Sequence, residues 1–307
     1  MVEPGRVFWQ DGALVDWKER GHTSLLTHTL HYGVGAFEGI RAYRRADGAT
    51  YVFRLQEHID RLMDSCRLVM IEPNMTAAQI VDGCIAVLRA NEMTEGYLRP
   101  VVLLGPGSMG ILPVDNPPST FVVAWSWGAY LGTDGLERGI RCKISAFSRH
   151  HIKGAFAKGK LCGQYINSVM AKQEAKASGF DEAIMLDVHG YVCEGSGENV
   201  FLVKNGRVTT PPLSASILAG LTRATVLALA EEEGMPVVEA PITRDELLLA
   251  DEVFLTGTAA EVTPVREVDH RRIGDGHRGP ITERLQQRFF EIVKGRDDSH
   301  PEWLARV

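Results

Sequence analysis

Residues 153–168 read K-G-A-F-A-K-G-K-L-C-G-Q-Y-I-N-S, and residues 181–201 read D-E-A-I-M-L-D-V-H-G-Y-V-C-E-G-S-G-E-N-V-F. The lysines of the first stretch lie among small and apolar residues rather than in a run of charges. Burial disfavours the ammonium form of lysine, and a neutral amine can form a Schiff base with an aldehyde. This stretch therefore contains candidate Schiff-base lysines.

Glu194 ends an apolar run and is followed at once by Gly195, Ser196 and Gly197. A carboxylate in this position can be held against the nitrogen of a pyridinium ring. A Schiff-base lysine paired with an acidic partner for the ring nitrogen is the arrangement expected for pyridoxal phosphate. A surface lysine and a glutamate in a turn would give the same sequence. The choice between these and a cofactor site therefore depends on the rest of the chain.

The overall composition excludes several classes of function. A length of 307 residues predicts about two domains, and 45% hydrophobic with 23% charged residues is ordinary for a soluble globular protein. A net charge of -6 without a basic cluster argues against nucleic acid or an anionic membrane as partner. No apolar run reaches the length of a membrane span, and the N-terminus lacks the basic-then-apolar order of a signal peptide.

The cysteines and histidines give no sign of a disulfide framework or a metal site. The five cysteines are scattered and contain no C-x-x-C, which favours reduced thiols and a cytoplasmic location. His28 and His31 have no third ligand in view, whereas a metal site needs three or four. We therefore expect no metal.

Residues 1–127 are predicted to form the smaller, N-terminal α+β domain. Hairpin turns are expected at Asp11-Gly12 and Asp47-Gly48, and an apolar stripe predicts a helix over residues 55–70. Thr76 is a good N-cap for a second helix. Strands are expected in Y-L-R-P-V-V-L-L-G and T-F-V-V-A-W-S-W, on either side of a long loop.

Residues 128–139 are glycine-rich and are predicted to be a linker to a larger, C-terminal mixed α/β domain over residues 140–307. The elements expected in this domain are a strand from residue 140, a helix over about 164–177, hairpin turns at His189-Gly190 and Asn205-Gly206, a helix starting near Gly220, a helix over 281–293 and a polar tail.

Two segments of the second domain are candidate anion sites. The helix starting near Gly220 and Thr222 offers backbone N–H groups, a hydroxyl and the positive end of the helix dipole, which suit a phosphate, although a plain capped helix looks the same. The Gly257-Thr258-Ala259 turn can bind a carboxylate or phosphate through consecutive N–H groups. Arg61 lies beside the stripe of the first helix, where a surface arginine is the alternative.

The chain contains, in this order, the segments F-E-G-I-R-A-Y, E-H-I-D-R-L, Y-L-R-P, W-G-A-Y-L-G, K-x-x-G-Q-Y-I-N-S, E-G-S-G-E-N-V-F, G-L-T-R and T-G-T-A-A-E-V-T-P. These segments resemble those of branched-chain amino acid aminotransferases, which are pyridoxal-phosphate enzymes of fold type IV. The resemblance runs from about residue 8 to residue 293. The motifs F-E-G-I-R and Y-L-R-P favour the branched-chain group, whereas others are shared with D-amino acid aminotransferases and aminodeoxychorismate lyases.

The resemblance implies a role for particular residues. Lys160 would be the Schiff-base lysine and the catalytic base, Tyr165 would bind the phenolic oxygen of the cofactor, and Glu194 its ring nitrogen. The phosphate would be held by Arg61, Leu221, Thr222 and Thr258. The segment H-H-I-K-G-A-F-A-K-G before Lys160 departs from the proline-rich approach of most members.

The resemblance also implies a substrate site. Tyr97 and the turn formed by Gly257, Thr258 and Ala259 would bind the α-carboxylate, and Arg99 the second carboxylate of glutamate. Ile111 of the partner subunit would close the pocket. The side-chain pocket would be lined by Tyr32, Phe37, Gly39, Trp127 and Tyr130.

We therefore expect a cytoplasmic transaminase that takes part in branched-chain amino acid biosynthesis. Its partners would be small amino acids and 2-oxo acids, together with a second copy of the chain, because the apolar loop of residues 105–118 is too long to remain free. The alternatives are a D-amino acid or (R)-amine aminotransferase, an aminodeoxychorismate lyase, and a non-catalytic protein that binds a phosphate ligand.

Overall fold

The computed structural model describes residues 4–128 and 131–307. These form two compact units. The first contains the described residues up to Gly128, Gly159–Gln164 and Ile292–Val307, and the second contains residues 131–158 and Tyr165–Glu291. The units are therefore discontinuous in sequence, whereas the sequence predicted one boundary segment between two continuous domains.

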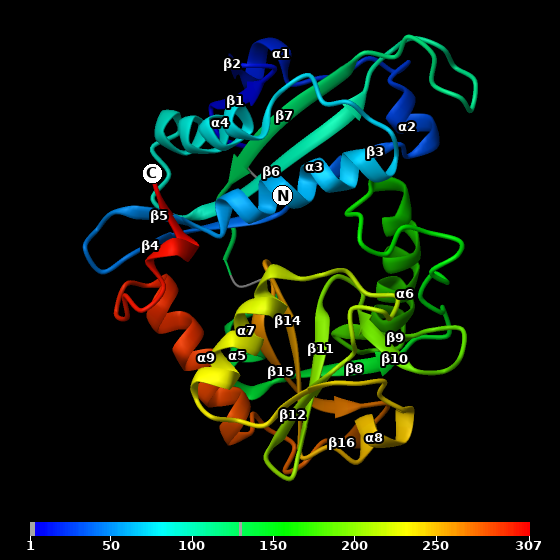
Figure 1. Cartoon of the computed structure of the whole chain (residues 1–307), viewed down its shortest axis with the longest axis vertical. Helices are drawn as coiled ribbons and strands as arrows, with labels where there is room; N and C mark the ends of the chain where they lie inside the picture. The colour runs from blue at the N-terminus through cyan, green and yellow to red at the C-terminus, as the bar shows by residue number, and fades with distance from the viewer. Residues whose placement is uncertain (1–3, 129–130) are drawn as a thin grey trace. The chain divides into compact units, whose positions relative to one another are not determined.

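The first unit contains an eight-stranded sheet in its described residues, with strand order β17-β5-β4-β6-β7-β1-β2 and β3 paired to β6. The long antiparallel pair β6 and β7 forms its centre (Figure 1). Its elements are β1 (Val7–Gln10), β2 (Ala13–Asp16), α1 (Trp17–Arg20), α2 (His28–Tyr32), β3 (Gly35–Phe37), β4 (Ile40–Arg44), β5 (Thr50–Phe53), α3 (Leu55–Leu68), α4 (Ala77–Ala90), β6 (Gly96–Leu104), β7 (Pro118–Trp125), the 3-10 turns η1 (Cys162–Gln164) and η2 (Pro301–Trp303), and β17 (Leu304–Arg306).

Helices α3 and α4 supply the apolar core of the first unit. The predicted stripe of α3 is confirmed, since Leu55, Ile59, Leu62 and Cys66 are all buried in the cluster that covers the sheet. Thr76 caps α4 as predicted, in a capping box with Gln79. The two hairpin turns at Asp11-Gly12 and Asp47-Gly48 also form as predicted, because left-handed glycines suit tight turns.

The second unit contains a nine-stranded sheet in its described residues, with order β10-β9-β8-β15-β14-β11-β12-β13 and β16 paired to β15. β10 also pairs with β11, so β8, β9, β10, β11, β14 and β15 close on themselves. The elements are α5 (Thr133–Arg138), β8 (Ile140–Ile144), α6 (Tyr165–Ala177), β9 (Glu182–Leu186), β10 (Val192–Gly195), β11 (Asn199–Lys204), β12 (Arg207–Thr210), α7 (Leu221–Glu232), β13 (Val237–Glu239), α8 (Arg244–Leu248), β14 (Glu252–Gly257), β15 (Glu261–Val268), β16 (Arg271–Arg272) and α9 (Pro280–Val293), whose last two residues belong to the first unit.

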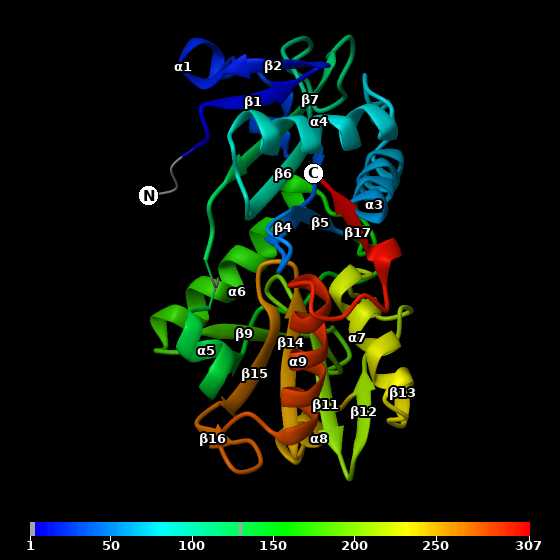
Figure 2. The ribbon, with the colours of Figure 1, turned by 90° about the vertical axis from the view of Figure 1, so that its left-hand side faces the viewer.

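Helix α9 lies along the sheet of the second unit (Figure 2). Gln286 donates to the carbonyl oxygen of Val262 on β15 at 2.7 Å. Thr282 donates through its hydroxyl to the Glu252 carboxylate of β14 at 2.6 Å. These bonds satisfy buried polar groups where the helix meets the strands.

The predicted linker of residues 128–139 contains helix α5, and residues 129–130 of it lie outside the described residues. The expectation of a polar tail without structure is wrong. The predicted polar tail contains β17, which pairs antiparallel with β5, and a buried Trp303. Among the helices of the described residues, none has the length and apolar character needed to span a bilayer.

Candidate active site

Lys160 belongs to the first unit, where its backbone is fixed on both sides. Its N–H donates to Oγ of Ser65 on α3 at 2.9 Å, and its carbonyl oxygen accepts from the N–H of Phe37 at 3.0 Å. The Lys160 ammonium lies 5.1 Å from the centre of the Phe37 ring, within the range of a cation–π contact. The lysine that the motif selected is therefore half-buried beside an expected pocket residue.

The two neighbouring lysines have different surroundings. Nζ of Lys158, in the second unit, donates to the carbonyl oxygens of Ala215 at 3.2 Å and Ile217 at 2.8 Å. Burial lowers the pKa of Lys158, partly offset by the charge of Glu194. Lys153 is exposed.

Tyr97 and Arg99 share a face of β6, because side chains alternate along a strand. Nη2 of Arg99 donates to the Tyr97 hydroxyl at 3.4 Å, and the guanidinium carbon lies 4.8 Å from the centre of the Phe37 ring. The Tyr97 and Trp127 rings meet edge to face at 4.7 Å. A Cβ at Gly39 would lie 1.7 Å from the Tyr97 hydroxyl, so this position requires glycine.

Arg61 of α3 forms a bidentate ion pair with Glu38, which lies between Phe37 and Gly39. Nε donates to Oε1 at 2.7 Å and Nη2 donates to Oε2 at 2.9 Å. The first unit thus groups Arg61, Lys160 and the expected wall of the substrate pocket around β3 and β6.

The remaining substrate residues of the first unit lie on exposed segments. The Tyr32 hydroxyl, at the end of α2, donates to the carbonyl oxygen of Met109 at 2.9 Å. Ile111, in the same loop as Met109, is 82% exposed. Tyr130 lies outside the described residues.

Glu194 belongs to the second unit and lies at the end of β10. It forms an ion pair with Nε of Arg149 at 2.7 Å and accepts from the backbone N–H of Leu218 at 3.0 Å. Nδ2 of Asn199 approaches the same carboxylate at 3.3 Å and donates to the carbonyl oxygen of Leu218 at 2.9 Å. These donors favour the ionised form of Glu194, as a partner for a protonated ring nitrogen must be.

Helix α7 begins beside this carboxylate. Gly220 is its N-cap and carries no capping side chain, and a Cβ there would lie 2.0 Å from Oδ1 of Asn199. Thr222 is buried in the first turn. A helix start of this kind suits a phosphate because its N–H groups and dipole favour an anion.

The turn Gly257-Thr258-Ala259 lies between β14 and β15 of the same unit. Register pairing puts Asn199 opposite Thr256, so the turn follows directly from the strand that flanks the Glu194 network. The Thr256 hydroxyl is buried, and no hydrogen-bond partner for it exists among the described residues. An orphaned hydroxyl directly before the Gly257-Thr258-Ala259 turn, which the sequence predicts to bind an anion, fits a site that receives a phosphorylated group. Tyr165, the first residue of α6, also belongs to this unit.

Reasoning from the sequence missed the partners of the charged site residues. The partner of Arg61 is Glu38, whose carboxylate also binds His58, and the partners of Glu194 are Arg149 and Asn199. Glu38 had one signal, a carboxylate in the glycine-rich apolar segment F-E-G-I-R, because a buried charge needs a partner. No comparable signal marks Arg149.

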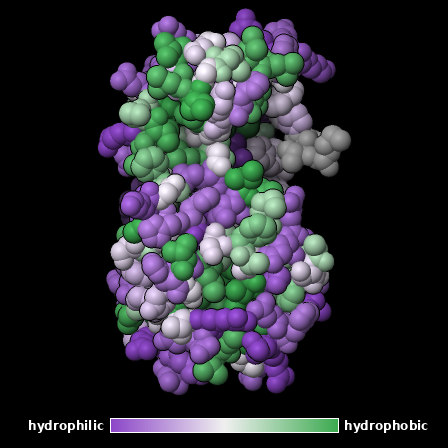
Figure 3. All heavy atoms as spheres, turned by 90° about the vertical axis from the view of Figure 1, so that its right-hand side faces the viewer, coloured by the Kyte–Doolittle hydropathy of each residue, from purple (hydrophilic) through white to green (hydrophobic). Residues whose placement is uncertain are grey.

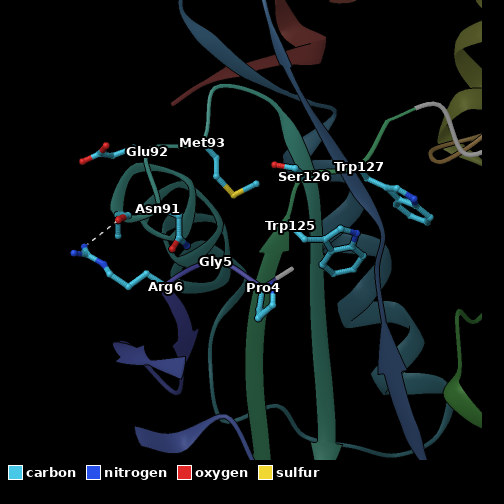
Figure 4. Close-up of a pocket in the computed structure, with 10 residues that line it drawn as sticks. Pro4, Gly5, Arg6, Asn91, Glu92, Met93, Trp125, Ser126 and Trp127 are labelled. Carbon is cyan, nitrogen blue, oxygen red and sulfur yellow. Dashed lines mark hydrogen bonds between the residues drawn. The ribbon is translucent and has the colours of Figure 1, made fainter. Parts of the chain in front are cut away.

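A separate pocket of about 920 Å³ lies within the first unit (Figure 4). It is lined by residues 4–6, by residues 90–93 at the end of α4 and by residues 125–127 at the end of β7. Of the expected site residues that the structure describes, only Trp127 borders it. The clusters around Lys160 and Glu194 therefore lie apart from the lining of this pocket.

Comparison with known proteins identifies the class. The amino-transferase class IV model matches residues 35–268, and the chain belongs to this family. The branched-chain-amino-acid aminotransferase of Pseudomonas aeruginosa is 48% identical over 307 residues, covering 100% of this chain and 99% of that protein.

Two solved structures are similar over nearly their whole length. The Escherichia coli branched-chain amino acid aminotransferase has a TM-score of 0.95 and 39% identity, with 98% of each chain covered. The Thermobaculum terrenum branched-chain amino acid aminotransferase, in its PLP form, has a TM-score of 0.93 and 32% identity, with 99% of each chain covered. The fold is thus fold type IV, and the chain is a pyridoxal-phosphate-dependent aminotransferase, as the resemblance implied.

Proposed function

We propose that this aminotransferase moves the amino group between L-leucine, L-isoleucine or L-valine and 2-oxoglutarate. The surroundings of Arg99 carry the proposal. Its guanidinium lies among the rings of Phe37, Tyr97 and Trp125, at 4.8, 5.4 and 5.6 Å. Its Nε is buried without an acceptor among the described residues.

An arginine among aromatic rings suits both the branched-chain amino acids and glutamate. The aromatic rings suit aliphatic side chains, and the arginine can pair with the second carboxylate of glutamate. The names of the relatives support the same substrates over those of the D-amino acid and lyase alternatives. Run from the corresponding 2-oxo acids, the same reaction forms the three amino acids, and in this direction we propose a part in branched-chain amino acid biosynthesis.

Pyridoxal phosphate, when bound, supplies an electron-withdrawing ring that accepts the electrons released at the substrate α-carbon. In our proposal Nζ of Lys160 removes the α-proton and later returns it, as a general base and then an acid. Glu194 keeps the ring nitrogen protonated, and Tyr165 binds the phenolic oxygen. Arg61, Leu221, Thr222 and Thr258 hold the phosphate.

The substrate is oriented by the remaining residues in this proposal. Tyr97 and the turn of Gly257, Thr258 and Ala259 bind the α-carboxylate. Arg99 binds the distal carboxylate of glutamate. The side-chain pocket is lined by Tyr32, Phe37, Gly39, Trp127 and Tyr130, with Ile111 of the partner subunit closing it.

The substrate assignment is tested with Arg99→Ala. Removing one member of a buried charge pair costs about 2–5 kcal/mol, so the half-reaction with glutamate should slow by that equivalent. The half-reactions with leucine, isoleucine and valine should slow by about tenfold or less, because apolar discrimination is worth only about 1–3 kcal/mol per group. The change in cofactor absorbance on adding each amino acid reports each half-reaction separately.

Arg67→Ala is the matched control, because Arg67 is 82% exposed and pairs with Asp64 on the same helix. It should leave both kinds of half-reaction unchanged. An equal loss for leucine and glutamate in Arg99→Ala would contradict the dual-substrate site.

The lysine assignment is tested by borohydride reduction and peptide mapping. Reduction should attach the cofactor to Lys160, and Lys160→Ala should remove the attachment. Lys158→Ala is the control from two residues away and should keep it, since Nζ of Lys158 is committed to the carbonyl oxygens of Ala215 and Ile217. Attachment to Lys158 would refute the assignment.

We also propose that two copies of the chain form the minimal active unit. Figure 3 shows hydrophobic side chains (green) exposed on the upper part of one face. The loop of residues 105–118 exposes Ile111 and Leu112 at 82% and 72%, and the segment before α2 exposes Leu25 at 84%. Exposed apolar side chains of this size favour an interface. A fully active monomer in sedimentation at assay concentration would contradict the proposal; larger assemblies of dimers would agree with it.

The domain organisation and the location of the protein complete the proposal. We retain a smaller N-terminal and a larger C-terminal domain as folding domains, and limited proteolysis between residues 128 and 139 tests them. The reduced, unpaired cysteines support a cytoplasmic location. Fractionation of cells that express the tagged chain tests the location.

A further inference from the structure

Glu38 is a carboxylate that the proposed chemistry does not use, yet it is completely buried. It lies in the short connection between β3 and β4, flanked by the expected pocket residues Phe37 and Gly39. An ionised carboxylate in such a place is costly unless it is paired and hydrogen-bonded. Its partners therefore show what it does.

The main partner is Arg61. Two parallel hydrogen bonds, from Nε at 2.7 Å and from Nη2 at 2.9 Å, fix both the position and the plane of the guanidinium. This fork-to-fork geometry directs the Nη1 edge of Arg61 away from Glu38. A long, flexible side chain is thereby held in one orientation.

The carboxylate itself is held by two more donors. Nδ1 of His58 lies 2.6 Å from Oε2 and must carry the proton, because a carboxylate only accepts. The backbone N–H of Gly39 donates to the same oxygen at 3.2 Å. Burial lowers the pKa of His58 despite the neighbouring carboxylate, so the imidazole is neutral and Arg61 provides the balancing charge.

The backbone of Lys160 is joined to Arg61 through Ser65. Oγ of Ser65 donates to the carbonyl oxygen of Arg61 at 2.8 Å and accepts from the N–H of Lys160 at 2.9 Å. The N–H of Glu38 donates to the carbonyl oxygen of Pro100 at 2.8 Å, next to Arg99. The orientation of Arg61 is thus fixed relative to the lysine within one unit.

We propose that Glu38 is a positioning residue, which holds the guanidinium of Arg61 in the orientation that binds the cofactor phosphate. This inference rests on the proposed role of Arg61 as a phosphate ligand. A simple counter-charge would have the opposite effect, because a negative group beside Arg61 weakens its attraction for phosphate. If Glu38 positions Arg61, replacing Glu38 should weaken phosphate binding. If Glu38 only neutralises Arg61, replacing it should strengthen phosphate binding.

The test compares two ligands of the apoenzyme, pyridoxal phosphate and pyridoxal, by absorbance or fluorescence titration. The ratio of their dissociation constants measures the contribution of the phosphate and needs no turnover. In Glu38→Gln the advantage of pyridoxal phosphate should fall by about tenfold or more, as for loss of a hydrogen bond to a charged group. The affinity for pyridoxal should change little.

Glu38→Asp separates position from charge. Aspartate keeps the negative charge, but its side chain is shorter by one methylene and cannot hold Arg61 in the same place. The preference for pyridoxal phosphate over pyridoxal should therefore fall in this variant too. An unchanged or increased advantage in Glu38→Gln or in Glu38→Asp would overturn the proposal. Glu57→Gln is the matched control, because it removes a carboxylate from α3, the helix that carries Arg61. Glu57 pairs with Arg54, so this variant should leave the ratio unchanged.

Arg61→Ala distinguishes failure of the inference from failure of the proposed phosphate site. If Arg61→Ala leaves the ratio unchanged, Arg61 does not bind the phosphate and both proposals fail. If Arg61→Ala lowers the ratio, Glu38→Gln added to it should lower the ratio no further. A full additional loss in the double variant would show that Glu38 acts without Arg61 and would overturn the inference alone.

Discussion

Glu38 in the first unit and Glu198 in the second are both buried carboxylates, but their neighbours differ. Arg61 and His58 surround Glu38. Burial pushes the pKa of Glu38 upward, yet the charge of Arg61 and the hydrogen bonds from Arg61 and His58 outweigh burial and hold this pKa well below its usual range. Glu38 is therefore ionised at neutral pH.

Glu198 follows Gly197 and accepts a hydrogen bond from the Gly197 N–H at 3.0 Å. Among the described residues it has no ion-pair partner, and the nearby cation Lys172 is paired with Glu182. Burial, followed by the negative charge of Glu182, raises the pKa of Glu198 to about 8. Burial alone thus does not decide the charge of a carboxylate, because the sign of the neighbouring charges decides whether burial is overcome.

The largest effect should come from Glu38→Ala. This change leaves the Arg61 guanidinium partly buried without its carboxylate, which costs about 3–5 kcal/mol of unfolding free energy. Urea unfolding of the apoenzyme at pH 7 measures it. Glu57→Ala on α3 is the control, because the Glu57 carboxylate is 40% exposed in its pair with Arg54, and it should cost less than about 1 kcal/mol. Similar losses for the two variants would remove the contrast between a buried carboxylate and a partly exposed one.

A pH series should separate the two buried carboxylates, beginning with Glu38→Gln. The folded pKa of Glu38 is lower than its ordinary value of 4.5, so ionisation stabilises the fold above that pH. Wild type should exceed Glu38→Gln by about 2–3 kcal/mol at pH 7, and the difference should shrink as the pH falls below about 4.5. A difference independent of pH would mean that Glu38 is not ionised in the fold.

Glu198→Gln should change stability with pH in the opposite direction. The folded pKa of Glu198, about 8, exceeds the ordinary value of 4.5, so the fold prefers the protonated acid. Its stabilising contribution is complete below about pH 4.5 and is lost as the pH rises to about 8. The neutral glutamine loses nothing over this range, so the stability of the variant relative to wild type should rise between about pH 4.5 and pH 8, and at pH 8 the variant should be the more stable of the two. A variant that is less stable than wild type at pH 8 would refute the protonated state.

The smallest effect should come from Asp251→Asn, which removes an exposed ion pair. Asp251 pairs with Lys204 at 2.7 Å, with both side chains nearly half exposed. Exposed pairs contribute less than about 1 kcal/mol, and salt screens them. Unfolding with and without 1 M sodium chloride measures the change. A larger loss that salt leaves unaffected would show that exposure does not weaken this pair.

Local patterns in the sequence predicted most of the elements. The turns at Asn205-Gly206 and His189-Gly190 and the helix start at Gly220 depend on a few adjacent residues, and each lies where the pattern placed it. The motif around Lys160 likewise distinguishes this lysine from Lys153 and Lys158 by adjacent residues alone. Such features need no knowledge of distant segments.

Features that join distant segments could not be predicted in the same way. The pairing of β17 with β5 and the ion pair of Glu194 with Arg149 join residues from separate parts of the sequence. Only a folded chain defines which charges meet, and a composition of 23% charged residues offers many possible pairs. The roles expected for Lys160, Glu194 and the other site residues stay predictions until the variants are measured.

The pairing of β17 with β5 also has a consequence for synthesis on the ribosome. β5 emerges early, yet its partner at Leu304–Arg306 is made about 250 residues later, which takes roughly 12–50 s at ~5–20 residues per second. During that interval one edge of β5 lacks its final neighbour, and an open edge is a site for wrong pairing. Nascent chains stalled before residue 301 should therefore be cut by protease near β5, a cleavage that the released chain should resist.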